Sequence, residues 1–304
     1  MKPSGYTLGD EQVALPPGAF AGTRRTMLRL DGQAVLGVTA GMFRPYLHPV
    51  YTPAGMAATT ESPADHPHHH SIWVGADHLH LVMPALGGRA EVYAYNCYVN
   101  DVFQGRAPGR ILQTGLTGHL ETDGFHITQQ IEWRGPVEWA APQGRLVLNE
   151  TRRTRVSLRD QVMVLDVRCE IRAAGHDIAI GPTRHAWFNF RVAPSMCVDE
   201  GGRIDTQGGR RSHADQVESH ASWVSLSGPA GGGLNAGIAM APGGRWPWWW
   251  FVSDWGVATA SPCRDQAIEL ASGSQTVLEA RYLVYDGEFD PFRCTPLLQA
   301  GSAL

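Results

Sequence analysis

A histidine-rich stretch between Glu61 and Trp73, ESPADHPHHHSIW, holds the residues of this sequence best suited to chemistry. Four of the thirteen histidines fall within five residues and follow an aspartate: Asp65, His66, His68, His69 and His70. Imidazole titrates near neutral pH and is also the commonest metal ligand among side chains. The cluster therefore predicts a site that binds a metal ion, moves protons or holds a substrate by hydrogen bonds.

The conformation of this stretch decides which histidines can act together. Pro63 and Pro67 disfavour a helix and favour an extended or turn structure. In an extended chain, His66, His68 and His70 would project to one side, where imidazoles at that spacing can share a divalent metal ion.

Three interpretations of the cluster stay open. In the first, His66, His68 and His70 bind a metal ion. In the second, Asp65, His66 and His69 take part in acid–base catalysis or hydrogen-bond a substrate. In the third, the stretch is a polar loop with no chemical role. Spacing alone does not choose among them.

A second candidate site lies in a strand-like run, GPTRHAWFNFRVAPS. Alternation from Thr183 places His185, Trp187 and Asn189 on one face of the strand. An indole that stacks on the C–H face of a sugar, beside an imidazole that reaches an oxygen, suits carbohydrate recognition. The alternative is a hydrogen-bonded histidine inside a sandwich core.

Two further segments supply candidates for substrate binding. In FRPYLHPVYTPAG, we expect Arg44, Tyr46 and His48 to close over the same pocket, the alternative being a turn with an arginine–carboxylate pair. In RWPWWWFVSDWG, core packing of the tryptophans is favoured over a stacking platform. Trp250 and Asp254 are the residues of this segment that we expect to contact a substrate.

Short strands are the elements that must position these residues. In QVMVLDVRCEI, apolar residues alternate with Asp166, Arg168 and Glu170, which is the pattern of a strand with one face in water. TVLEARYLVY repeats this pattern, and helical periodicity is almost absent. Thirty-five glycines and twenty prolines suit many tight turns between strands. We therefore predict an all-β fold, a large antiparallel β-sandwich.

The organisation of the chain follows from its composition. No break in composition divides it, so we expect one domain over residues 1–304, with residues 1–20 as a flexible N-terminal segment. No apolar run approaches eighteen residues, so a membrane span is not expected. Five cysteines without a CxxC pair indicate reduced thiols and a cytoplasmic location.

Charge and motifs narrow the class of partner. A formal net charge of −4 gives no electrostatic footprint for nucleic acid or an anionic membrane. The motifs of nucleotide binding are missing, so no nucleotide cofactor is expected. We predict a small-molecule substrate and either no cofactor or one divalent metal ion. The oligomeric state stays open.

Several segments together resemble a family of soluble bacterial proteins labelled PmoA-like, after a methane monooxygenase subunit. They are RPYLHPVYTPAG, DHPHHHSIW, FRVAPSM, EGGRIDTQGGRR, SWVSLSG, AGIAM and SDWGVATASP, within residues 43–290. The resemblance implies a β-sandwich often found beside sugar oxidoreductases, with no established reaction. The chain departs from the family's Trp-His-Val-Arg-Asp-Tyr-Gly stretch, because Phe251 and Ser253 stand where that stretch has histidine and arginine.

The run TRHAWFNF is also similar to a strand of aldose 1-epimerases, the galactose mutarotase-like supersandwich enzymes. That resemblance implies the supersandwich form of the β-sandwich. It also implies that His185 is the general acid and that Glu269, in AIELASG, is the base.

Together these observations predict an enzyme that moves protons on a sugar or sugar-like substrate without a redox cofactor. The substrate would carry a carbonyl or hemiacetal, and the outcome would be epimerisation or β-elimination, with or without a metal ion. One alternative is a tailoring lyase or cyclase of a specialised metabolite. Another is a carbohydrate-binding protein that catalyses nothing.

Overall fold

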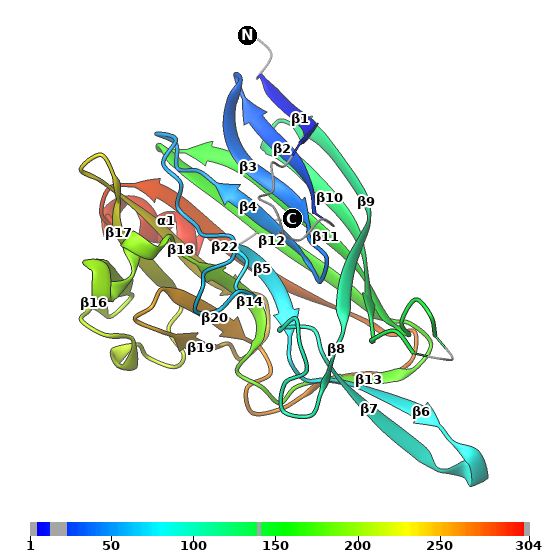
Figure 1. Ribbon diagram of the computed structural model, residues 1–304. Helices are drawn as coiled ribbons and strands as arrows, with labels where there is room; N and C mark the ends of the chain where they lie inside the picture. Colours follow the sequence, from blue (N-terminus) through cyan, green and yellow to red (C-terminus); the bar gives the residue numbers. More distant parts are fainter. Residues whose placement is uncertain (1–4, 13–22, 139–140, 301–304) are drawn as a thin grey trace.

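The computed structural model describes residues 5–12, 23–138 and 141–300, and two large antiparallel sheets face each other in it (Figure 1). The first sheet has eight strands, in the spatial order β1 (Tyr6–Glu11), β2 (Arg24–Leu30), β3 (Gln33–Ala40), β4 (Pro45–Val50), β5 (Ile72–Ala76), β14 (Ala186–Arg191), β20 (Val257–Ser261) and β19 (Trp249–Val252).

The second sheet has nine strands and carries the longest hairpins. Their spatial order is β16 (Gly209–Arg211), β15 (Arg203–Thr206), β17 (Val224–Gly231), β18 (Leu234–Gly243), β22 (Gln275–Asp286), β12 (Val162–Ala173), β11 (Leu146–Arg159), β10 (Gly124–Arg134) and β9 (Arg110–Glu121). The turn between β11 and β12 places Asp160 and Gln161 at positive φ, as a two-residue hairpin loop requires.

A third, smaller sheet lies at one end of the sandwich. Its order is β21 (Ile268–Leu270), β13 (Asp177–Ile180), β6 (Leu79–Pro84), β7 (Ala90–Asn96) and β8 (Ala107–Pro108). Figure 1 shows β6 and β7 projecting from the body as a hairpin. Within the described residues every strand pairing is antiparallel except the short contact of β7 with β8.

Large side chains of the two big sheets meet in one core. Trp133 on β10 stacks on Trp187 of β14, with ring centroids 4.9 Å apart, and Phe190 of β14 meets Tyr282 of β22 edge-on. All four side chains are buried. Aromatic pairs of this kind bury a large apolar area and also favour a defined geometry. The core therefore fixes how the sheets face each other.

A helix covers part of the outer face of the nine-stranded sheet. Helix α1 (Pro291–Gln299) begins after Asp290, whose carboxylate accepts a hydrogen bond from the Phe292 amide. Its Cys294 and Leu298 pack into a second apolar cluster with residues of β12, β18 and β22. Short 3-10 helices complete the described structure: Leu86–Gly88, Pro194–Met196, Val198–Glu200 and Ala214–Gln216.

Most of the predicted architecture is confirmed, with one local correction. The fold is a large antiparallel all-β sandwich, and the 163–171 run forms part of β12. The prediction that the charged face of this strand meets water is wrong at Asp166. Its carboxylate is buried, because α1 lies over this part of the sheet. The carboxylate accepts hydrogen bonds from Arg155 and Arg281. Buried carboxylates need such partners.

The other predictions about the organisation of the chain have different outcomes. The N-terminal segment includes β1, which pairs with β2, while residues 1–4 and 13–22 lie outside the described residues. The five cysteines are free and buried. The helices of the described ranges are too short or too polar to cross a bilayer. The one-domain organisation stays a prediction.

The placement of Trp187 makes a testable statement about stability. Trp187→Ala should lower the free energy of unfolding by about 3–5 kcal/mol, because it opens a cavity beside Trp133. Trp187→Phe keeps an aromatic ring and should cost less. Urea denaturation measures both values. Leu158→Ala, at a half-exposed leucine, is the control and should change stability by less than about 0.5 kcal/mol. A Trp187→Ala loss no larger than that of the control would contradict the core placement.

Candidate functional site

A pocket of about 300 Å³ collects most of the chemistry that the sequence offers. It lies where the eight-stranded sheet meets the turns that precede β5 and the loop that follows β7. Twelve side chains line it: His66, His68, His69, Asp77, Asn96, Tyr98, Val99, Phe103, Arg184, His185, Phe251 and Trp255. A cavity of this size falls at the lower end of the range for small-molecule sites.

Strand pairing explains why an aspartate and a histidine meet in this pocket. Ala76, the last residue of β5, is the antiparallel partner of Ala186, the first residue of β14. Asp77 follows β5 and His185 precedes β14, so the two residues lie side by side. The Nδ1 atom of His185 is 3.1 Å from Oδ2 of Asp77, and the Asp77 amide donates to the His185 carbonyl.

Asp77 is buried, and both oxygens of its carboxylate have hydrogen-bond partners. Thr183 donates its hydroxyl to Oδ1 at 2.5 Å, and Nδ1 of His78 lies 2.7 Å from the same oxygen. Burial alone would raise the pKa of Asp77, but the hydrogen bonds from His185, His78 and Thr183 hold it at about 2. Asp77 is therefore a carboxylate at neutral pH and orients the His185 ring.

The second ring nitrogen of His185, Nε2, faces the pocket wall formed by Arg184 and Phe251. Arg184 donates its Nε–H to Nε2 of His185 at 3.2 Å, and its guanidinium lies 4.6 Å from the centre of the Phe251 ring. The two contacts place Nδ1 of His185 against Asp77 and make Nε2 the acceptor from Arg184. Such an orientation by a carboxylate is what a general base requires.

The histidine-rich stretch folds as two successive turns, which is one of the two conformations that its prolines predicted, and not as an extended chain. The His66 amide donates to the Pro63 carbonyl, and the His69 amide donates to the His66 carbonyl. Consequently His66, His68 and His69 line the pocket together, which strict alternation would not allow. Burial lowers the pKa of His68 to about 4 and lowers that of His69 as well.

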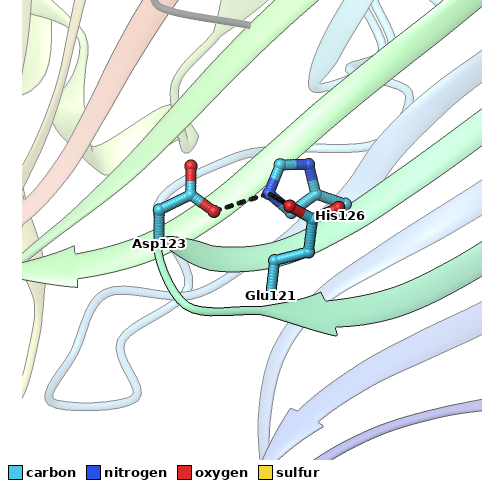
Figure 2. Close-up of side chains that lie close together, drawn as sticks. All are labelled: Glu121, Asp123 and His126. Carbon is cyan, nitrogen blue, oxygen red and sulfur yellow. Dashed lines mark hydrogen bonds and ion pairs between the residues drawn. The ribbon is translucent and has the colours of Figure 1, made fainter.

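His70 lies outside the pocket, so the predicted metal set of His66, His68 and His70 does not converge. Its ring stacks on Tyr46, with centroids 4.6 Å apart, and its Nδ1 contacts the Glu61 carbonyl at 2.8 Å. Among the described residues, a different set brings three potential ligand atoms within 4.8 Å of one another: Glu121, Asp123 and His126 (Figure 2).

Aromatic rings form one wall of the pocket. The His66 ring stacks on Trp255 at 4.3 Å, and the guanidinium of Arg191 lies 4.6 Å from the centre of the same indole. Asp65 accepts hydrogen bonds from Arg191 and contacts Nδ1 of His66. Asp65 therefore holds the wall in place from outside the lining. Asp65 is not a lining residue, and its catalytic role stays a prediction.

Arg44 supports the pocket from behind. Its buried guanidinium donates to the carbonyls of His68 and Val99, so it joins the histidine turns to the loop after β7. Burial lowers the pKa of Arg44 to about 10, which still leaves it charged at neutral pH. The predicted substrate contact is replaced by a contact with the backbone of two pocket walls.

Tyr46 and His48 belong to a neighbouring cluster around Glu61. The Tyr46 hydroxyl donates to Oε1 of Glu61 at 2.8 Å, Arg25 donates to the same oxygen, and Nε2 of His48 lies 3.6 Å from Oε2. Burial lowers the pKa of His48 to about 4. Both predicted substrate ligands therefore lie outside the pocket.

The other predicted site residues also lie outside the pocket. Trp187 belongs to the core, and Asn189 is buried behind Tyr98, whose hydroxyl it contacts at 3.2 Å. Trp250 is buried and donates its indole N–H to the Ala221 carbonyl. Asp254 accepts from the Ala214 amide, and Glu269 is exposed on β21. Every residue of β14 is buried, so neither face of this strand is open to solvent and alternation could not tell the pocket side from the core side.

Several residues of the pocket were not predicted from the sequence. Asp77, Tyr98, Arg184, Phe251 and Trp255 carry no motif by which they could be recognised singly. Asp77 does follow an apolar strand, IWVGA, which is a common position for a functional carboxylate, but only the β5–β14 pairing supplies its partner.

A larger cavity, of about 570 Å³, lies elsewhere between the two big sheets. Tyr6, Asp31 and Tyr51 are its titratable residues, and most of the rest of its lining is apolar or uncharged. Clustered acid–base groups distinguish a reactive site better than size does. The smaller pocket is therefore the candidate active site.

Comparison with known proteins shows which family the chain belongs to. The chain matches a family of unknown function, DUF6807, over residues 26–298. The Slr1438 protein of Synechocystis sp. PCC 6803 has a similar structure, with 9% identity, a TM-score of 0.37 and coverage of 86% of this chain and 92% of that one. A protein from Escherichia coli K12 provisionally named an aldose 1-epimerase has 12% identity, a TM-score of 0.34 and coverage of 92% and 99%. No curated protein matches the chain, and nothing in these comparisons supports the PmoA-like resemblance.

The buried histidines predict how stability depends on pH. Burial lowers the pKa of His70 from 6.5 to about 3, so the unfolded chain takes up its proton first as the pH falls. The contribution of neutral His70 to the free energy of unfolding is complete above pH 6.5. It is lost as the pH falls from 6.5 to 3, because the unfolded chain is protonated first. We expect His70→Gln to flatten the pH dependence of the unfolding free energy by up to about 1.4 kcal/mol per pH unit in this window. Urea denaturation at pH 7, 6 and 5 measures the slopes, and equal slopes would contradict a neutral, buried His70.

Proposed function

We propose that this chain, which belongs to the family of unknown function DUF6807, is an acid–base enzyme acting on a sugar or sugar-like carbonyl or hemiacetal substrate. The observation that carries the proposal is the contact between buried Asp77 and Nδ1 of His185 in a pocket with aromatic walls. His185 serves as the proton-transfer group, and Asp77 positions it. A cytoplasmic location belongs to the same proposal.

The pocket supports proton transfer because its histidines differ in their surroundings. His185 presents Nε2, while Asp77 stabilises the imidazolium that forms when this nitrogen takes a proton. His68 stays neutral at pH 7, since burial lowers its pKa, and can hydrogen-bond a carbonyl or hydroxyl oxygen. A neutral imidazole beside a base is a suitable donor to the oxygen on which charge develops.

The walls support a substrate with both apolar and polar faces. Tyr98, Phe251 and Trp255 offer aromatic surface, while His66, His68 and Arg184 offer polar groups. Sugars combine C–H faces with hydroxyl edges, and aromatic rings beside hydrogen-bonding groups match that combination. This lining supports the proposed substrate class.

Two reactions fit the same groups, and each balances without a redox cofactor. With a keto-sugar, His185 removes the proton next to the carbonyl, and the enediolate either regains a proton on the other face or expels a β-substituent. With an aldose, proton transfer from the anomeric hydroxyl and to the ring oxygen breaks the ring C–O bond and opens the hemiacetal.

One observation favours a second candidate, a tailoring lyase or cyclase that acts on a less polar carbonyl compound. Val99, Phe103 and Phe251 give part of the pocket an apolar lining. The proton chemistry at His185 would be unchanged, and only the substrate would differ.

Proton NMR in D₂O separates these possibilities with the full-length protein and a panel of aldoses and ketoses. Deuterium at the carbon next to the carbonyl indicates an enediolate, faster anomer exchange without deuterium indicates ring opening, and alkene signals indicate elimination. His185→Gln should slow the observed reaction by about 10²–10⁴-fold. Saturable sugar binding without turnover would overturn the enzyme proposal in favour of a carbohydrate-binding protein.

Asp77 should act on rate more than on affinity, because both of its carboxylate oxygens already contact protein groups, Oδ2 with His185 and Oδ1 with Thr183 and His78. We expect Asp77→Asn to lower kcat by about 10²-fold or more while KM changes little. His78→Gln is the matched control, since it removes another contact of Asp77 and leaves the contact with His185. If the control lost as much activity as Asp77→Asn, a general structural role would replace positioning.

A further inference from the structure

A second group of metal-ligating side chains lies at the tip of the β9–β10 hairpin, outside the pocket (Figure 2). Glu121 ends β9, Asp123 lies in the turn, and His126 lies two residues into β10. His119 is the direct cross-strand partner of His126, and their rings are 5.5 Å apart. Side chains of directly opposite residues share one face of a hairpin.

Distances within this group approach those of a metal site. Nε2 of His126 lies 2.9 Å from Oδ1 of Asp123 and 3.9 Å from Oε2 of Glu121. Ligand atoms around a tetrahedral zinc ion are about 3.3 Å apart, given bonds of about 2.0–2.1 Å. Nε2 of His119 is 2.7 Å from Oε1 of Glu121, so His119 contacts one member of the group but lies outside the set of three ligand atoms that are within 4.8 Å of one another.

We propose that Glu121, Asp123 and His126, with His119 as a fourth ligand, bind a divalent transition-metal ion such as Zn²⁺. Two imidazoles with two carboxylates suit Zn²⁺, whereas Mg²⁺ and Ca²⁺ prefer oxygen ligands alone. The hairpin register, and not a loop, fixes three of the four positions. The ion would replace the hydrogen bonds that the ligands make to one another.

Arg155 orients Asp123 and does not block the site. It donates to Oδ2 of Asp123 at 2.5 Å, which leaves Oδ1 toward His126. Arg155 also contacts Asp166, so its charge is shared with a second carboxylate.

The ion would stabilise the end of the sandwich near β1. Phe125 follows the turn and packs against Tyr6 of β1, with ring centroids 5.6 Å apart. A ligand that binds only the folded chain raises its stability by mass action. Zinc binding is therefore expected to raise the melting temperature, independently of catalysis in the pocket.

Isothermal titration of the untagged, EDTA-treated full-length protein with ZnCl₂ tests the site. We expect one equivalent of Zn²⁺ to bind, a higher melting temperature with Zn²⁺, and no response to MgCl₂ at the same concentration. The double variant His119→Gln/His126→Gln should lose both effects. The matched double variant His66→Gln/His68→Gln, in the pocket, should keep them.

Two results would overturn the inference. One is the absence of stoichiometric zinc binding by the wild-type protein. The other is zinc binding that survives in the hairpin variant, whether or not the pocket variant loses it. The hairpin substitutions leave His185 in place. Absence of zinc binding at the hairpin would therefore not contradict the proposed enzyme, and absence of catalysis in the pocket would not contradict the zinc site.

Discussion

The pairing of β5 with β14 in the middle of the eight-stranded sheet is the constraint on which the candidate site depends. It makes Ala76 and Ala186 neighbours, and so brings Asp77 and His185 together at one end of the pair. Asp77 is held as a carboxylate by its hydrogen bonds, and burial strengthens its interaction with the imidazole. A shift of one residue in this register would separate the two groups.

The core provides the rigidity that this register requires. One face of β14 is covered by the nine-stranded sheet, through the stacking of Trp187 on Trp133. On the other side, Asn189 hydrogen-bonds to Tyr98 and Thr259 and thus fixes the floor behind the pocket. Well-packed cores have few alternative arrangements, so the positions of His185 and Tyr98 are defined by contacts far from any substrate.

Buried polar groups connect the loops of the site to this framework. Arg44 ties the histidine turns to the loop after β7 through two backbone carbonyls, and Asp65 holds Arg191 beside Trp255. Residues that looked like substrate ligands therefore act as supports. Such supports matter because catalytic groups work only when neighbouring contacts lock their orientation.

The sequence by itself determined the class of fold and the chemical character of the site. Alternating apolar residues and abundant turn residues predicted an antiparallel β-sandwich, and the clustering of histidines predicted a site with His66 and His69, which line a pocket together with His185. These features are local, since periodicity and composition depend on near neighbours in the chain.

Only the tertiary structure decided which side chains meet. Asp77 and His185 are more than a hundred residues apart in sequence, and their contact depends on a strand pairing that no local pattern encodes. Likewise, the histidine-rich stretch forms two turns, and His70 packs on Tyr46 outside the pocket. Trp187 packs on Trp133 in the core. Alternation gives the two faces of a strand, but what covers each face is decided by the packing of the sheets.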